Sequence, residues 1–166
     1  MKLVSSTAVF KLEATDLSKW SGVEYEKVKK FNSIKIKLVE GGCSFVYGNG
    51  KVVIVGSKNI NESAIVTSIT TKSRIIEKPI VKNLVFSGKL NKRINLQMTC
   101  KNLQKSNQWL AINEPELFPA LFAREKKKKP SIQFSDSGSY VITGVSTEQE
   151  AMDIFKLASL HLVHRD

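Results

Sequence analysis

The chain has 166 residues, of which 42% are hydrophobic and 25% charged, a composition typical of an ordinary soluble protein of one compact domain. No apolar run approaches the ~20 residues that a membrane-spanning helix needs, and the first residues lack the apolar stretch of a signal peptide, so we expect an intracellular protein with no membrane partner. Lysine and arginine number 26 against 15 acidic residues, and this net charge of +11 favours a polyanionic partner, chiefly nucleic acid.

Strands and turns dominate the first part of the chain. Alternating apolar residues predict four strands, at 2–11, 34–38, 44–47 and 52–55. A short helix interrupted at Ser21-Gly22 is predicted within 16–29, and Gly41-Gly42 and Gly48-Asn49-Gly50 provide turns because these residues tolerate positive φ. Segment 65–71 is rich in β-branched residues, so propensity alone would make it a strand.

The second part follows a similar plan. Its predicted strands lie at 81–90, 117–124, 131–134 and 140–143, with a helix between the first two and a turn at 136–138. The last helix begins at Ser146-Thr147, where Glu150 completes a capping box. Its expected core stripe has helical spacing and consists of Met152, Phe155, Ala158 and Leu162.

An internal repeat relates the two parts. The segment Gly50-Lys51-Val52-Val53-Ile54-Val55-Gly56 resembles Gly138-Ser139-Tyr140-Val141-Ile142-Thr143-Gly144, at an offset of 138 − 50 = 88. Phe31 and Phe118 match at 118 − 31 = 87, and Leu3-Val4 resembles Leu84-Val85. Two copies are too few for a solenoid, so we predict one pseudo-symmetric domain of repeats 1–79 and 80–166. The repeat also predicts a helix at 65–71, because its partner segment is one.

Groups that would support catalysis or metal binding are sparse. Cys43 and Cys100 have no ligand spacing and are interpreted as reduced, packed thiols. His161 and His164 lie three apart but have no third ligand beside them. No glycine-rich phosphate loop or nucleophile elbow is present, so we predict no enzyme activity, cofactor, metal or small-molecule substrate.

One string in the second copy carries a family resemblance. It reads Asn113-Glu114-Pro115-Glu116-Leu117-Phe118-Pro119 and is followed by Tyr140-Val141-Ile142-Thr143-Gly144. The first copy has a fainter version in Glu24-Tyr25, Phe31 and the segment 50–58. Together these resemble the two-repeat core domain of the TATA-box-binding protein family. The resemblance implies an α+β fold, a pseudo-twofold saddle whose curved antiparallel sheet has a concave DNA-binding face and helices on its convex back.

The family kinks DNA with a pair of phenylalanines from each repeat, which wedge between base steps in the minor groove. The matching positions are Phe31 and Tyr47 in the first copy, and Phe118 and Ser135 in the second. Serine cannot wedge. Phe134 stays in the candidate set, although a step of one residue puts it on the opposite strand face.

The family also places an asparagine and a threonine from each repeat at the centre of the site. Asn83 and Thr143 match these positions in the second copy, whereas the first copy has Lys2 and Val55. Lys35, Lys37 and Lys51 are further candidates, as contacts to phosphate that fix affinity but not sequence. The run 124–129 could grip phosphate near the loop that the family calls a stirrup, act as a nuclear localisation signal, or be a mobile loop.

A protein partner is implied by the same string. In the family this stirrup region is where a TFIIB-type initiation factor docks, so Glu114, Glu116 and Leu117 are candidate partner contacts. The resemblance therefore implies a transcription initiation factor that binds and bends promoter DNA with relaxed or altered specificity, recruits a TFIIB-like factor and RNA polymerase, and acts in the nucleus or at a site of viral transcription. The alternative is a protein-interaction module with the same fold and little DNA binding of its own.

Overall fold

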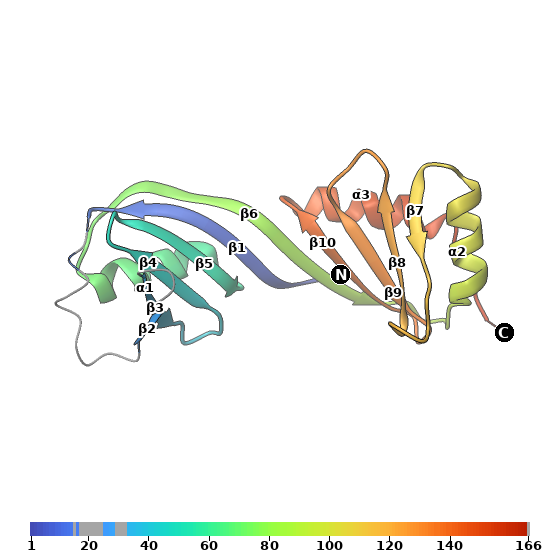
Figure 1. Ribbon diagram of the computed structural model, residues 1–166, viewed down its shortest axis with the longest axis horizontal. Helices are drawn as coiled ribbons and strands as arrows, with labels where there is room; N and C mark the ends of the chain where they lie inside the picture. The colour runs from blue at the N-terminus through green and yellow to red at the C-terminus, as the bar shows by residue number, and fades with distance from the viewer. Residues whose placement is uncertain (15, 17–24, 29–32, 166) are drawn as a thin grey trace. The chain divides into compact units, whose positions relative to one another are not determined.

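The computed structural model describes residues 1–14, 16, 25–28 and 33–165 (Figure 1). It divides into two compact units. We call Val4–Asn83 the N-terminal unit, and Met1–Leu3 with Leu84–Asp166 the C-terminal unit. Among the helices in the described ranges, none is long and apolar enough to cross a membrane.

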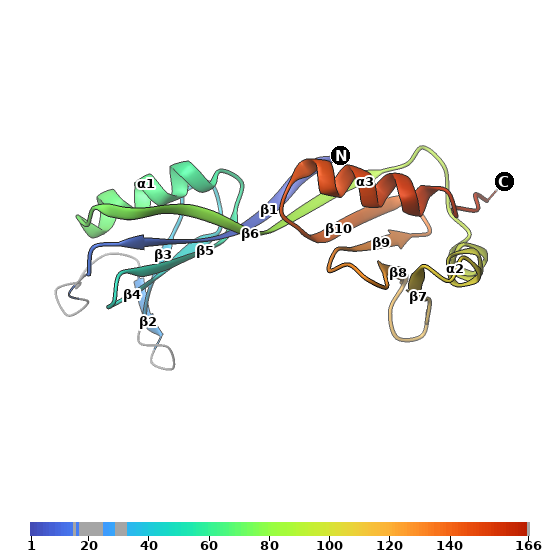
Figure 2. The same cartoon turned by 90° about the horizontal axis from the view of Figure 1, so that it is seen from above.

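In the N-terminal unit, five described strands form an antiparallel sheet with a described helix on one face (Figure 2). The strands run in the order β2-β3-β4-β5-β1. They are β1 (Lys2–Leu12), β2 (Tyr25–Val28), β3 (Ser33–Lys37), β4 (Cys43–Tyr47) and β5 (Lys51–Ser57), followed by the helix α1 (Ile60–Thr71). The first two residues of β1, Lys2 and Leu3, belong to the C-terminal unit.

Among the described residues, the C-terminal unit repeats this order of elements and has the helix α2 (Leu96–Lys105) after its first strand; the matching stretch of the N-terminal unit lies largely outside the described ranges. Its strands run in the order β6-β10-β9-β8-β7, and the first of them, β6 (Ile75–Lys89), belongs to the N-terminal unit up to Asn83. Its other elements are β7 (Trp109–Ile112), β8 (Ala120–Glu125), β9 (Ser131–Ser135), β10 (Ser139–Val145) and α3 (Glu148–Ser159). Strand, three consecutive hairpin strands, a further strand and a helix thus occur twice in one chain. The α+β class and the repeated plan are confirmed.

The helix predicted only from the repeat is present. Asn59 caps α1 by accepting a hydrogen bond from the Glu62 backbone N–H at 3.2 Å, and Lys72 ends it in the left-handed conformation. The predicted capping box of α3 is also present, because Thr147 accepts from the Glu150 N–H at 3.1 Å and the Glu150 carboxylate accepts from the Ser146 N–H at 2.8 Å.

Five details differ from the sequence-based expectations. Within 16–29, the described residues 25–28 form a strand, and the other residues except Asp16 lie outside the described ranges. β6 begins at Ile75 rather than 81, and β7 is absent from the predictions because four residues give too short a pattern. Residues 117–119 precede β8 instead of belonging to it. In α3 the buried residues are Ala151, Ile154 and Ala158, while Met152 is exposed.

Two glycines explain why the repeat is visible in the sequence. Gly50 and Gly138 open strands β5 and β10 at φ +82° and +86°. A Cβ at Gly50 would lie 2.1 Å from the Leu12 carbonyl oxygen, and one at Gly138 would lie 2.4 Å from that of Lys92. No side chain fits at either turn, so both copies retain glycine there.

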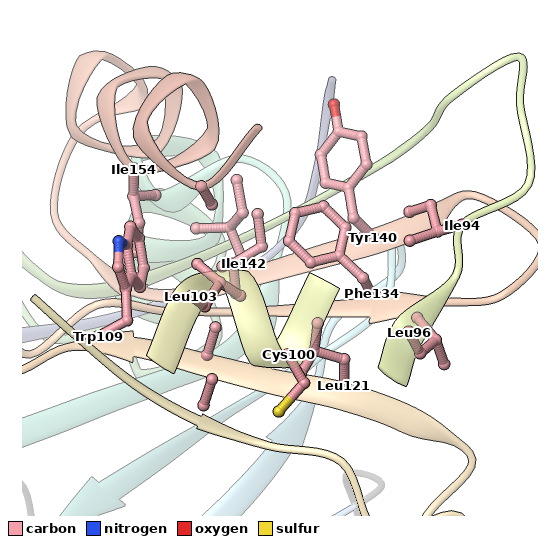
Figure 3. Close-up of a cluster of buried hydrophobic side chains, with 14 of the residues drawn as sticks. Ile94, Leu96, Cys100, Leu103, Trp109, Leu121, Phe134, Tyr140, Ile142 and Ile154 are labelled. Atoms are coloured by element: carbon pink, nitrogen blue, oxygen red, sulfur yellow. The ribbon is translucent and has the colours of Figure 1, made fainter. Parts of the chain in front are cut away.

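The core of the C-terminal unit is aromatic (Figure 3). Tyr140 stacks on Phe155 with ring centroids 4.4 Å apart, and Phe134 lies beside Tyr140 at 6.3 Å. Trp109 makes an edge contact with His161 at 6.5 Å. Both α2 and α3 pack on this cluster, through Leu103 and Ile154 among others.

The core of the N-terminal unit is smaller and its helix interface is polar. Phe10, Val52 and Ile54 are buried beneath α1, which contributes Ala64. Hydroxyl pairs then join the helix to the sheet. The side chains of Thr67 and Ser44 are hydrogen-bonded at 2.7 Å, as are those of Ser63 and Ser57.

Candidate nucleic-acid interface

Each unit has a sheet face opposite its helices, which we call the open face. Alternation along the strands decides its members: even residues of β1 from Ser6 onward are buried against the helix side, and odd ones are not. In the N-terminal unit the open face comprises Thr7, Val9, Lys11, Lys35, Lys37, Cys43, Phe45, Tyr47, Lys51, Val53 and Val55. In the C-terminal unit it comprises Ser87, Lys89, Leu110, Ile112, Ala120, Phe122, Arg124, Ser131, Gln133, Ser135, Ser139, Val141 and Thr143.

The open face of the N-terminal unit combines lysines with apolar side chains. Strand pairing sets Lys35, Phe45, Val53 and Val9 in one row across the sheet. The strands β1, β3, β4 and β5 contain no aspartate or glutamate. Lys11 lies 3.8 Å from Glu77, whereas no described carboxylate pairs with Lys35, Lys37 or Lys51. These three ammonium groups are therefore available to an anionic partner.

The open face of the C-terminal unit is richer in hydroxyl and amide groups. One row runs through Ile112, Phe122, Gln133, Val141 and Ser87. A second row contains Leu110, Arg124, Ser131 and Thr143. The predicted contact Thr143 is half-buried here, and its counterpart Val55 is 39% exposed on the other unit. The hydroxyl of Thr143 thus faces outward in the C-terminal unit, and at the same position of the N-terminal unit the two methyl groups of Val55 face outward.

The two predicted wedge positions on β4 and β9 are equivalent. Tyr47 pairs with Ser33 and Ser135 pairs with Ala120, at matching points of the two sheets. The Ser135 hydroxyl donates to the Ser139 carbonyl at 3.3 Å. Phe118 is 49% exposed, as a wedge requires, while Phe31 lies outside the described residues.

Phe134 is not a contact residue. Its side chain is fully buried among the aromatic rings of the core, because it points to the helix side of β9 while Ser135 points to the open face (Figure 3). The inclusion of Phe134 in the candidate set was wrong.

Strand register also changes one predicted counterpart. Ser6 pairs with Ser57, and Leu84 pairs with Val145, which lies 145 − 57 = 88 residues further on. The residue equivalent to Asn83 is therefore the one before Ser6, namely Ser5. Lys2 is exposed and lies 5 − 2 = 3 residues before this position, so its assignment as the counterpart of Asn83 was wrong.

The loop between β7 and β8 holds the candidate protein contacts. Glu114, Glu116 and Leu117 are all exposed, Leu117 by 81%. The Glu114 carbonyl accepts hydrogen bonds from the backbone N–H groups of Leu117 at 3.0 Å and Phe118 at 2.9 Å, so the loop has a defined turn. An exposed leucine next to two exposed glutamates gives this loop an apolar point with negative charge beside it.

The basic run 124–129 lies elsewhere. It occupies the end of β8 and the connection to β9, at the opposite end of β8 from the 113–119 loop, which corrects its expected place near the stirrup. Within it, Lys126 bonds the Asn107 side chain at 2.8 Å and Lys128 pairs with Glu125 at 3.0 Å. Only Arg124 of this run lies on the open face.

Titratable groups with shifted pKa values lie away from the open faces. Burial raises the pKa of the Cys100 thiol and of the Tyr140 hydroxyl, and both side chains belong to the core. Both cysteines are free. In the part of the chain that the structure describes, no three histidine, cysteine, aspartate or glutamate side chains group as a metal site would require.

Several residues of the open faces were missed from the sequence. Phe45, Phe122 and Gln133 lie between the predicted contacts. Their alternation with buried neighbours was a usable signal, since Lys35 and Lys37 were selected by it. The side that faces the helices became clear only from the structure.

Comparison with known proteins agrees with this geometry. The family "Transcription factor TFIID (or TATA-binding protein, TBP)" matches residues 78–161. The chain is 32% identical to TATA-box-binding protein 3 of Methanosarcina mazei, over 86% of this chain and 82% of that protein, and 30% identical to the TATA-box-binding protein of Methanothrix thermoacetophila, over 90% and 82%. The solved structure of Methanococcus jannaschii TBP matches with a TM-score of 0.73 and 26% identity, covering 94% of both chains. The chain therefore belongs to the TATA-box-binding protein family.

Proposed function

We propose that this protein binds the minor groove of promoter DNA through its open faces, bends it, and serves as a transcription initiation factor with an altered sequence preference. As a member of a family of transcription factors it is not an enzyme. The observation that carries the proposal is the open face of the N-terminal unit, where Lys35, Lys37 and Lys51 surround apolar side chains, and where strands β1 to β5 contain a single acidic residue, Glu26, the register partner of Lys35. Such a surface suits a polyanion whose minor groove admits apolar side chains between base steps.

The altered preference follows from the side chains that differ between units. Val55 cannot donate the hydrogen bond that Thr143 offers, and Ser135 cannot wedge as an aromatic ring does. Binding should then depend more on phosphate contacts and on DNA deformability than on base edges.

The test is binding to a TATA-like duplex and a scrambled G·C-rich duplex across a salt series, with a fluorophore pair that reports bending. Replacing Lys35, Lys37 and Lys51 with alanine should reduce the slope of log K against log salt by roughly 2 to 3, about 0.9 for each lost phosphate contact. The matched control replaces Lys101 and Lys105 on α2 and Lys156 on α3 with alanine. This triple variant loses the same net charge but keeps the lysines of the open face. Equal effects of both triples would contradict a binding site on the open face.

Bending is tested separately with Phe118→Ala. The side chain is half-exposed, so its loss should leave the fold intact while reducing the bend signal. If the wild-type protein binds neither duplex at low salt, promoter binding by the isolated protein is excluded.

A second function is favoured by the exposed 113–119 loop: docking of a TFIIB-like factor, which would bring RNA polymerase. If the protein is mainly an interaction module, the factor binds it without DNA. In either case the double variant Glu114→Ala/Leu117→Ala should abolish the complex with the factor and leave DNA affinity unchanged. The relatives come from archaea, so nuclear localisation stays a prediction.

A further inference from the structure

The centres of the two open faces carry different side chains. Phe45 is the middle residue of β4, the third strand of its sheet, and Gln133 is the middle residue of β9, the third strand of the other sheet. The two are equivalent by the repeat, since 133 − 45 = 88. Both are half-buried on the open face. An apolar ring in one unit is thus replaced by a carboxamide in the other.

Gln133 has no hydrogen-bond partner among the described residues and lies between apolar neighbours. Its flanking side chains in the row are Phe122 and Val141, neither of which can bond it. The polar side chains nearest to it are diagonal neighbours, Ser139 and Thr143 on β10 and Arg124 on β8, each on the order of 7 Å away between Cβ atoms. A ligand covering Phe122 and Val141 would exclude water from the carboxamide, so the ligand itself must then supply the hydrogen bonds.

We infer that Gln133 lets the C-terminal unit accept a G·C base pair in the minor groove, whereas Phe45 confines the N-terminal unit to A·T pairs. This inference rests on the proposed DNA binding and gives the protein two different half-site preferences.

The chemistry follows from the groove edges. A·T and T·A pairs present only acceptors in the minor groove, and a G·C pair adds the guanine N2 amino donor. A glutamine carboxamide has both an acceptor oxygen and a donor NH₂ group, so it can bond either kind of pair. A phenylalanine ring offers no such acceptor. A guanine amino group pressed against Phe45 would lose its hydrogen bond to water without replacement.

The inference is tested by measuring affinity for a palindromic A·T duplex and for versions with G·C pairs in one half or in both halves. One G·C pair in one half should weaken binding less than about threefold, because the protein can place Gln133 over it. G·C pairs at symmetry-related positions in both halves should weaken binding at least about tenfold, because one must meet Phe45. Pairs are scanned position by position, and each duplex is compared with its inosine·C version, which lacks only the N2 amino group.

Two substitutions test the assignment. Gln133→Leu should make the single G·C duplex bind at least about tenfold more weakly than its inosine version, whereas the wild-type protein should bind the two duplexes within about threefold of each other. Phe45→Gln should restore binding to the doubly substituted duplex. A wild-type protein that rejects the single G·C pair at every position, or a Gln133→Leu variant with the wild-type pattern, would overturn the inference while leaving DNA binding intact. Failure to bind even the all-A·T and inosine duplexes would overturn the proposed function and this inference with it.

Discussion

The two units share one order of elements but hold their helices by different chemistry. In the C-terminal unit, Phe134, Tyr140 and Phe155 form the contact between sheet and helix. In the N-terminal unit, α1 packs through small residues, and the hydroxyls of Ser63 and Thr67 bond those of Ser57 and Ser44. The hydroxyl pairs demand a specific geometry, because a buried hydroxyl without a partner is costly.

The same arrangement of a helix on a sheet is thus held by aromatic packing in one unit and by hydroxyl pairs in the other. The open faces diverge as well, with lysine and apolar side chains on one unit and hydroxyl and amide groups on the other. Once a domain carries two copies of a surface, each copy can acquire its own preference.

The largest effect is expected in the aromatic core. Phe134→Ala should reduce the free energy of unfolding by about 3–5 kcal/mol, because it removes a fully buried ring. Urea unfolding followed by the fluorescence of Trp109, which is buried in the same cluster, measures it. The control is Ser135→Ala on the open face, expected within about 0.5 kcal/mol of wild type. Similar losses for both variants would show that β9 does not separate the two faces as described.

A smaller effect is expected at the shared turn. Gly50→Ala and Gly138→Ala should each cost ~2 kcal/mol or more, because both positive φ and a backbone oxygen oppose the new Cβ. Gly41→Ala is the control, since Gly41 has φ +94° but nothing within 4 Å of the added carbon. Thermal unfolding compares the three. Equal losses of stability for Gly41→Ala and Gly50→Ala would mean that positive φ alone causes the loss, and that contact of the added Cβ with the backbone oxygen contributes nothing.

The hydroxyl interface should show coupling. Thr67→Val should cost about 1–2 kcal/mol, because it leaves the buried Ser44 hydroxyl without its partner. Combining it with Ser44→Ala should cost less than the sum of the two single changes. Chemical denaturation of the four proteins completes the cycle. Strict additivity would mean that the 2.7 Å contact contributes nothing.

The last prediction needs no mutation and compares the rates at which the thiols of Cys43 and Cys100 react. Cys43 is half-buried on the open face, whereas Cys100 is buried and its pKa is raised by burial, which disfavours the reactive thiolate. We expect maleimide to label Cys43 first, and a bound DNA duplex to slow that labelling while leaving Cys100 unchanged. Mass spectrometry of the labelled peptides reads both rates. Faster labelling of Cys100 would contradict the buried position of α2.

Much of this architecture could be predicted from the repeat. The segment 65–71 has the composition of a strand, yet its alignment with α3 correctly made it a helix, whose caps at Asn59 and Lys72 override propensity. β7 could not be predicted, because Trp109 to Ile112 is too short for periodicity to separate it from a loop. The register of Ser5 needed the β1–β5 pairing, since the start of each copy has few matching residues. Alternation along β9 puts Gln133 on the same face as Ser135, but only the structure shows that this face is the one opposite the helices.

The paired glycines have a consequence for finding other distant duplications. Gly50 and Gly56, like Gly138 and Gly144, are six residues apart and all have positive φ. Between the copies, many core and open-face residues have changed, such as Val52 to Tyr140 and Phe45 to Gln133, while this spacing has not. Positions where only glycine fits change more slowly than positions selected for binding. The spacing of such glycines can therefore reveal a common ancestry after the two copies have lost a common specificity.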